Sequence, residues 1–461
     1  MKQRHFNLFG ARLLTLCLFS LFMTQTAFAS SIGTTYGFSP RGMAMGNAMS
    51  AHVNDWSSVY YNMAGLGKTK ELIERAKSKE KSGINQVSVN YLVTAPQLDI
   101  NINRVDKDGT PLSTNGAEDL DFGTFMMGFA MDLNTIYRMP DPVSSARMGF
   151  AMGTNDDLTV VKINDVDPRT HNFLRYGKEA QRALILAGAG FGFMDDLFGV
   201  GLGLNISFGG SGTIALSDLE VTEDEQIPID NAMMDISLEP TMVAGLYFSP
   251  GRRYQALEGL NFGLTYRQKS KLDISPLNTV AKLKTGNVLL NLKLALLDYF
   301  QPDIFTFGTS WQHSQRLTLS LEAEFQRWSG FAISANHETN FANDLPELDD
   351  IIVPKLGFEY LVSRRLAIQG GYCYEPSFIP DSGLEKSINF LDSNKHIASI
   401  GASYRLPAFT RMRREVTLFA AFQQQFLEKR DVKKLEPTGV NPNYSFEGNV
   451  STVYMGLTIN M

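Results

Sequence analysis

The 461-residue chain has very few cysteines, and this shortage limits how the fold can be held together. Cys17 lies in an apolar segment near the N-terminus, and Cys373 lies far downstream. If the N-terminal segment is removed on secretion, one thiol remains and no internal disulfide can form. The mature fold must therefore be stabilised without covalent cross-links.

Long apolar runs are also missing beyond the N-terminus. The best candidate for a membrane-spanning helix, residues 288–300, is short and carries Asn291, Lys293 and Asp298. A helix needs about 20 mostly apolar residues to cross a bilayer. A spanning helix is therefore not expected. A soluble periplasmic protein and a barrel remain open, because the hydropathy of alternating barrel strands averages out.

An excess of basic charge is absent as well. The chain starts with three basic residues, the apolar run 13–23 and then Ala27-Phe28-Ala29, which is typical of a secretory signal peptide cleaved after Ala29. Removal of residues 1–29 leaves 39 basic residues against 48 acidic ones, a net charge of −9. This balance argues against a nucleic-acid partner.

Motifs for catalysis or cofactor binding are lacking too. Residues 65–69, Gly-Leu-Gly-Lys-Thr, imitate the end of a phosphate-binding loop, but Asn62 stands where that motif needs a glycine. The histidines are scattered without the spacing of a metal site, and no Gly-x-Ser-x-Gly elbow is present. We therefore expect no enzyme, no cofactor and no metal site.

The chain is rich in alternating apolar and polar side chains. In residues 452–461 and again in 317–325, apolar side chains occupy every second position. A period of two over about 9–11 residues is typical of a strand that crosses a membrane at a tilt. We expect such strands at 84–97, 121–132, 145–154, 180–193, 198–216, 232–248, 259–271, 287–312, 316–328, 351–361, 365–374, 396–406, 414–426 and 449–461.

Fourteen strands make an even number, as expected for a bacterial single-chain barrel. We therefore predict an all-β fold, a 14-stranded antiparallel transmembrane β-barrel over residues 84–461. Residues 287–312 contain Pro302 and are expected to form one bent strand, because proline fits poorly inside a paired strand.

The connections between the expected strands fall into two length classes. Barrels of this kind place long loops outside the cell and short turns in the periplasm. A soluble β-sandwich has no reason for such a division. The long polar class comprises 98–120, 155–179, 329–350, 375–395 and 427–448, and the short class comprises 194–197, 313–315, 362–364 and 407–413.

Residues 39–67 do not alternate and are rich in glycine, alanine and methionine. Small residues allow close backbone approach, and methionines fill irregular space. Such a segment suits a compact plug, which a barrel of fourteen strands needs to avoid leakage. We expect a hatch and linker over residues 30–83, in which the charged stretch 68–81 is a solvated linker or a short helix.

Two motifs in this segment carry a family resemblance. Gly42-Met-Ala-Met-Gly-Asn-Ala48 and Asp55-Trp-Ser-Ser-Val-Tyr-Tyr-Asn-Met-Ala-Gly-Leu66 resemble the hatch of the long-chain fatty-acid transporter (FadL/TodX-like) family of outer-membrane proteins. Gly371-Tyr-Cys-Tyr-Glu-Pro-Ser377 and the segment 391–401 are similar to later strands of that family. Met63 stands where the family usually has proline, so the fixed backbone angle of proline is missing at this corner.

The resemblance implies passive uptake of long-chain fatty acids or similar hydrophobic molecules across the cell outer membrane, with hatch movement and lateral release. It implies that Asn62, Met63, Ala64 and Gly65 form the gating hatch corner, and that residues 30–39 line the ligand pocket. The implied partners are the hydrophobic cargo, outer-membrane lipid and lipopolysaccharide, and the barrel assembly machinery during insertion.

Other functions remain open at this point. The connection 217–231 is acidic and would repel a carboxylate, which favours a neutral hydrocarbon, aliphatic or aromatic, as cargo. A binding or scaffold barrel of the same fold and an outer-membrane enzyme are alternatives. Three inward carboxylates are expected to solvate the wall or dock the hatch rather than to catalyse: Glu322, Glu324 and Glu359.

Overall fold

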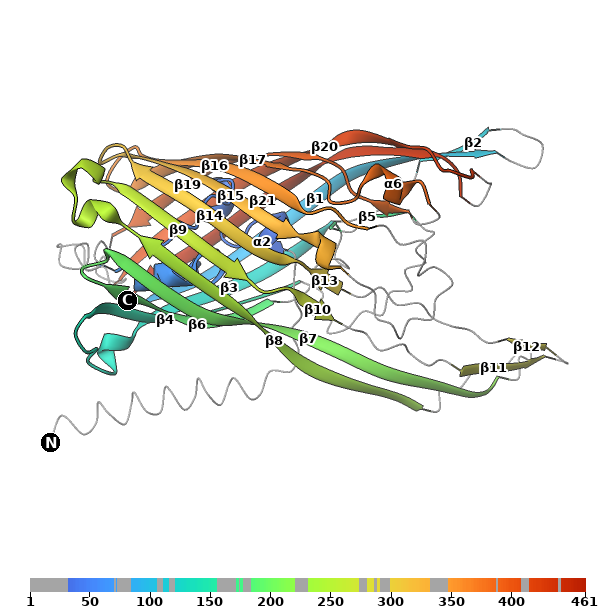
Figure 1. The fold of residues 1–461 in the computed structure, drawn as a ribbon, viewed down its shortest axis with the longest axis horizontal. Coiled ribbons are helices and arrows are strands. Elements are labelled where there is room, and N and C mark those ends of the chain that lie inside the picture. The colour runs from blue at the N-terminus through green and yellow to red at the C-terminus, as the bar shows by residue number, and fades with distance from the viewer. Residues whose placement is uncertain are drawn as a thin grey trace.

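A barrel wall of fourteen antiparallel strands surrounds a small helical segment in this computed structural model (Figure 1). The structure describes residues 32–69, 72, 84–105, 111–115, 121–155, 171–173, 175–176, 184–219, 231–272, 280–285, 288–290, 299–331, 347–386, 389–407, 414–437 and 441–461. The expected signal peptide, residues 1–29, and most of the charged stretch 68–81 lie outside these ranges.

The wall strands follow one another around the barrel in sequence order. They are β1 (Gln86–Val105), β3 (Phe122–Asp132), β4 (Val143–Asn155), β6 (Leu184–Phe193), β7 (Phe198–Leu219), β8 (Asn231–Phe248), β9 (Leu260–Arg267), β14 (Asp303–Gln312), β15 (Leu317–Arg327), β16 (Ile351–Leu361), β17 (Leu366–Glu375), β19 (Lys395–Leu406), β20 (Glu415–Val432) and β21 (Tyr444–Asn460).

The barrel closes because its first strand pairs with its last. β1 and β21 run antiparallel from Gln86 opposite Asn460 to Ile102 opposite Tyr444. A membrane requires such closure, since backbone groups left unpaired in hydrocarbon are costly. The predicted 14-stranded barrel is therefore confirmed.

Side chains alternate across the wall as the sequence pattern predicts. In β21, Val453, Met455 and Leu457 point outward and are 37–58% exposed, whereas Thr452 and Tyr454 are fully buried. The outward face would contact lipid, and the inward face contacts the hatch or lines the lumen.

The expectation of one bent strand over residues 287–312 is wrong. The wall strand β14 begins at Asp303, directly after Pro302. The described residues before it form two small pairings: β12 (Val288–Leu290) pairs with β11 (Val280–Thr285), and β13 (Tyr299–Gln301) pairs with β10 (Ser270–Leu272). Proline has no amide hydrogen to donate, so it precedes the paired strand instead of bending it.

Two connections expected to be polar loops are partly strand. β1 continues to Val105 and pairs there with β2 (Pro111–Asn115). β20 likewise continues to Val432, where it pairs with Tyr444 at the start of β21. Leu98 and Ile100 point inward while Asp99 is exposed, so the period of two persists above the membrane. The outward face is polar there, and the sequence therefore resembled a loop.

Short turns gather at one end of the barrel, together with the C-terminus (Figure 1). They include η2 (Leu133–Thr135), η3 (Pro250–Arg252) and η4 (Gln255–Leu257). We assign this end to the periplasm. The longer connections at the other end carry β5 (Asn172–Phe173), η5 (Trp328–Gly330), α6 (Asp381–Leu384) and β18 (Phe390–Leu391).

The hatch fills the lumen toward the periplasmic end. It consists of α2 (Ile32–Thr35), α3 (Pro40–Ala44), α4 (Ser58–Tyr61) and η1 (Met63–Gly67). Ser39 caps α3 by accepting a hydrogen bond from Gly42, and Pro40 occupies the first helical position, where its missing amide hydrogen costs nothing. Within the described residues, no helix has the length and apolar character required to cross a bilayer.

Candidate functional site

The predicted hatch corner lies at the junction of α4 and η1 and is fully buried. Asn62 caps η1, because its side-chain oxygen accepts a hydrogen bond from the Ala64 amide at 3.1 Å. Its side-chain amide donates to the carbonyl oxygens of Ser50 at 2.7 Å and Leu246 at 2.9 Å. Asn62 thus joins two parts of the hatch to each other and to wall strand β8.

The rest of the corner is seated against glycines of β6 and β7. The side chain of Met63 lies over Gly188 and Gly203, and a methyl group added at Gly201 would overlap the backbone between Met63 and Ala64. Only glycine allows one backbone to approach another this closely. The corner therefore occupies a recess that the missing side chains of the wall provide.

Arg147 of β4 holds the corner from the neighbouring side, although no motif in the sequence marks this residue. Its guanidinium donates to the carbonyl oxygens of Leu66 and Asn54, each at 2.6 Å, and of Gly65 at 3.4 Å. The side chain is fully buried. The sequence did contain one clue to this role. Arg147 is a single arginine at an inward position of a strand made mostly of small and apolar residues, and a buried charge needs partners inside the barrel.

Carboxylates of the wall hold the middle of the hatch. Glu359 of β16 forms a bidentate pair with Arg41, with both nitrogen–oxygen distances at 2.9 Å. Glu322 of β15 accepts a hydrogen bond from a hatch amide at 2.8 Å. The third expected carboxylate, Glu324, pairs with Lys355 of the wall at 2.7 Å. Glu359 and Glu322 thus dock the hatch, and Lys355 pairs with Glu324 and also, at 3.2 Å, with Glu322.

His52 of the hatch lies within this charged contact. Its Nε2 atom is 2.6 Å from the guanidinium of Arg41 and 3.5 Å from Glu359. Burial lowers the pKa of His52, and the positive charge of Arg41 lowers it further. The ring is therefore held neutral where it accepts from the guanidinium.

Neutral groups hold the N-terminal part of the hatch, residues 32–39. Gln423, Gln425 and Tyr454 from β20 and β21 donate to its carbonyl oxygens at 2.8–3.1 Å. Charged hydrogen bonds are roughly twice as strong as neutral ones. The N-terminal part is therefore held less firmly than residues 41–67.

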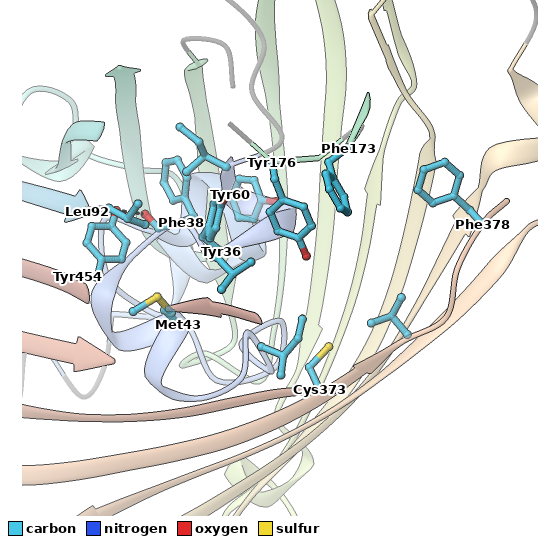
Figure 2. Packing of buried hydrophobic residues seen from close by; sticks show 14 of the residues in the cluster. Tyr36, Phe38, Met43, Tyr60, Leu92, Phe173, Tyr176, Cys373, Phe378 and Tyr454 are labelled. Carbon is cyan, nitrogen blue, oxygen red and sulfur yellow. Dashed lines mark hydrogen bonds between the residues drawn. The ribbon is translucent and has the colours of Figure 1, made fainter. Parts of the chain in front are cut away.

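Aromatic rings lead from the hatch toward the outer rim. The ring centroids of Tyr36 and Tyr176 are 6.5 Å apart, and those of Tyr176 and Phe173 are 6.3 Å apart. Phe173 meets Phe446 at 5.9 Å, and Phe446 meets Tyr444 at 6.2 Å. Figure 2 shows Tyr36, Tyr176 and Phe173 following one another away from the hatch. We call these five residues the aromatic column.

Aliphatic side chains complete the apolar lining around the aromatic column. They belong to the same buried cluster as the hatch residues Ile32, Tyr36 and Phe38. The part of the expected pocket segment 30–39 that is described thus contributes to this lining, while Ser30 and Ser31 lie outside the described residues. Members from the wall and outer loops include Leu98, Ile100, Ile102, Leu384, Leu391 and Leu427.

Four buried charges beside the column neutralise one another. Glu375 contacts Arg175 and lies 3.5 Å from the Nζ atom of Lys395, which is 3.1 Å from Asp392. The guanidinium of Arg175 also lies over two aromatic rings, 4.9 and 5.1 Å from their centroids. The aromatic column is therefore an apolar surface flanked by charges that neutralise one another. Such a surface suits an extended apolar molecule.

Comparison with known proteins gives the chain a family. The family described as outer membrane protein transport protein (OMPP1/FadL/TodX) matches residues 193–461. The chain is similar to alkane uptake protein A of Marinobacter nauticus, with 23% identity over 460 residues covering 95% of this chain and 93% of that protein.

Solved structures of similar fold cover nearly the whole chain. A FadL homologue of Pseudomonas aeruginosa has a TM-score of 0.54 at 16% identity and covers 95% of this chain and 99% of its own. The toluene transporter TodX of P. putida has a TM-score of 0.46 at 13% identity, with 92% and 99% covered. The first of these likenesses supports the barrel fold alone.

Proposed function

The chain belongs to the OMPP1/FadL/TodX family of outer-membrane transport proteins, and on this premise we propose that it takes up long aliphatic molecules through its plugged barrel. The observation that carries the proposal is the aromatic column, which continues from the outer rim to the hatch inside one apolar cluster. A water-filled pore would offer such a molecule nothing.

The apolar lining supplies enough free energy to draw a long chain out of water. Burial of one CH₂ group is worth about 0.8 kcal/mol, so a chain of roughly sixteen carbons gains on the order of 12 kcal/mol before the costs of binding. This gain depends on length and needs no charged anchor. A passive route driven by the concentration gradient is therefore sufficient.

The hatch corner is proposed to act as the gate. Asn62, Met63, Ala64 and Gly65 close the inner end of the lumen against the glycines of β6 and β7. Glycine inside a strand weakens it, because no side chain packs there. We infer that a shift of the corner uncovers this glycine patch, and that the cargo leaves sideways along it.

The cargo is proposed to be a neutral alkane in preference to a fatty acid. Two buried cations beside the column, Arg175 and Lys395, are already paired with Glu375 and Asp392. A third, Lys434, lies 5.2 Å from the ring centroid of Tyr444 and donates to the carbonyl oxygens of Leu384 and Lys386. The sequence of the connection 217–231 is acidic as well. A relative over nearly the whole chain is named as an alkane uptake protein, which agrees with this preference.

Uptake assays in a strain lacking the gene, with and without the gene on a plasmid, test the proposal. Labelled hexadecane should enter faster in the complemented strain, and labelled palmitate should gain less. Tyr176→Ser interrupts the column and should reduce hexadecane uptake. Tyr137→Ser changes an exposed tyrosine at the periplasmic end and should leave uptake unchanged. If complementation changed the uptake of no cargo, the transport proposal would be wrong.

A further inference from the structure

Arginine is concentrated at the periplasmic end of the wall. Five of the short connections there carry exposed arginines, and these connections are spread around the barrel from β3–β4 to β19–β20. The exposed arginines in the described residues of this end are Arg138, Arg252, Arg253, Arg316, Arg364, Arg365 and Arg414. We call these seven residues the arginine rim.

Acidic side chains do not balance the arginine rim. The exposed carboxylates in the described short connections of this end are Asp141, Asp195 and Glu258, against seven arginines. In the part of the chain that the structure describes, no ion pair joins any of these three to Arg138, Arg316 or the pair at 364–365. The described short connections of this end are therefore positive, although the whole chain has a net charge of −6.

Two of the turns present their arginines on the same fixed backbone. The Ser314 hydroxyl accepts from the amides of Arg316 at 3.3 Å and Leu317 at 3.1 Å. The Ser363 hydroxyl does the same for Arg365 at 3.2 Å and for the next amide at 3.1 Å. The arginine side chains take no part in these bonds. They remain available for a partner outside the barrel.

Exposed apolar and aromatic side chains lie among the same turns. Tyr137 is 66% exposed, Tyr254 56% and Trp311 45%. Tyrosine and tryptophan favour the level where lipid tails meet headgroups, since each ring has an apolar body and a polar atom. Arginine beside them reaches the phosphate level. The periplasmic end thus has the composition of a membrane interface.

We infer that the arginine rim binds the phosphate groups of anionic phospholipids in the inner leaflet of the outer membrane. The guanidinium forms paired hydrogen bonds with phosphate, and all seven residues are arginine. Charge spread around the circumference fits a surrounding lipid surface. An acidic protein would contact one sector of the barrel and would leave the other arginines unused.

The opposite end of the wall differs, which supports the assignment. Exposed carboxylates are frequent there among the described residues, as at Asp99, Asp349, Asp350, Asp381 and Glu436. Among the described exposed residues, carboxylates thus outnumber cations such as Lys386 and Lys429 at the outer end, whereas arginines predominate at the periplasmic end. The inference rests on the outer-membrane location and is independent of the cargo.

Native mass spectrometry of the purified full-length mature protein tests the inference. Phosphatidylglycerol and phosphatidylcholine are added in turn to the protein in detergent, and bound lipid is counted. Each basic residue near an anionic surface contributes about fivefold in affinity. Arg364→Gln with Arg365→Gln should therefore weaken phosphatidylglycerol binding by roughly 20-fold and leave phosphatidylcholine binding unchanged.

Two matched variants separate charge from fold and position. Arg364→Lys with Arg365→Lys keeps the charge and should retain most of the binding. Arg327→Gln removes an exposed arginine at the outer end of β15 and should change nothing. Equal binding of the two lipids, or no loss in the double glutamine variant, would overturn the inference. Retention of an acidic protein without any preference for phosphatidylglycerol would overturn it too. Hexadecane uptake is measured separately, so neither proposal decides the other.

Discussion

Single residues decide how closely the hatch can approach the wall. Gly201 of β7 lies directly against the backbone between Met63 and Ala64, and Gly245 of β8 lies against the side chain of Asn62. These glycines lie inside regular strands, where they weaken the sheet. Glycine is present at these positions because any side chain would occupy the space that the hatch fills.

Gly201→Ala is expected to displace the hatch corner. The added methyl group would overlap hatch backbone, which cannot move aside as the end of a side chain can. A planar-bilayer recording should show a higher resting conductance than in the wild type. Gly153→Ala in β4 is the matched control, because its methyl group would lie 3.1 Å from the flexible side chain of Met126. Equal conductance in both variants would mean that the corner does not seal the barrel.

His52 is expected to make docking of the hatch sensitive to pH. In the docked hatch its pKa lies below the ordinary value of 6.5, first through burial and then through Arg41. Protonation therefore favours the undocked state. Docking is fully stable above about pH 6.5 and weakens as the pH falls below that value.

Conductance at pH 7.5 and at pH 5.5 measures this effect. The wild type should leak more at pH 5.5, because the protonated ring faces the guanidinium of Arg41. His52→Gln keeps a polar group of similar size that does not titrate, and its conductance should vary less between the two pH values. If the variant kept the full pH dependence, another group would be responsible.

At the scale of elements, the hatch consists of two parts held by different chemistry. Residues 41–67 are held by Arg41, Arg147 and Glu322, each through a charged hydrogen bond. Residues 32–39 are held by glutamine and tyrosine side chains. Because the neutral bonds are weaker, α2 should open before α3 and η1.

Hydrogen exchange followed by mass spectrometry can resolve the two parts. Peptides covering residues 32–39 should exchange faster than peptides covering 58–67. Gln423→Ala with Gln425→Ala should accelerate exchange at 32–39 by up to about 30-fold, since two hydrogen bonds of about 1 kcal/mol each are lost. Exchange at 58–67 should be unchanged. Uniform acceleration of both peptides would indicate that the hatch opens as one unit.

The sequence predicted the wall better than the contents of the barrel, for a physical reason. Each wall strand must present apolar side chains to lipid on one face, so apolar and polar side chains alternate within every strand. Residues 452–461 can therefore be recognised as a wall strand without knowing which strands pair with them. Arg147 and Gln425 act on hatch residues far away in the chain, and nothing local marks them as docking groups. The strand boundary at Pro302 was predicted wrongly, because the sequence does not distinguish a proline that precedes a strand from one that bends it.

At the scale of the whole molecule, the barrel is a scaffold around one buried apolar cluster, along which we propose the path of the cargo. The wall is closed by the pairing of β1 with β21, the hatch blocks its inner end, and the aromatic column runs between hatch and outer rim. Beside it, Arg175 and Lys395 pair with Glu375 and Asp392, and Lys434 donates to the carbonyl oxygens of Leu384 and Lys386. Selection of cargo should therefore depend on length and apolar area more than on a headgroup.

Chain length distinguishes selection by apolar area from selection by a headgroup site. Each added CH₂ group that enters the path should raise affinity by at most about fourfold, from about 0.8 kcal/mol of burial. A series of alkanes from eight to sixteen carbons, competing with labelled hexadecane for the purified protein, measures the increment. The matching fatty acids should show a similar increment with uniformly weaker binding, because burial of the carboxylate costs desolvation energy and Arg175 and Lys395 are already paired with carboxylates. If the fatty acids bound more tightly than alkanes of equal length, a headgroup site would exist in the lumen, and the paired charges around Lys395 would be the first place to look for it.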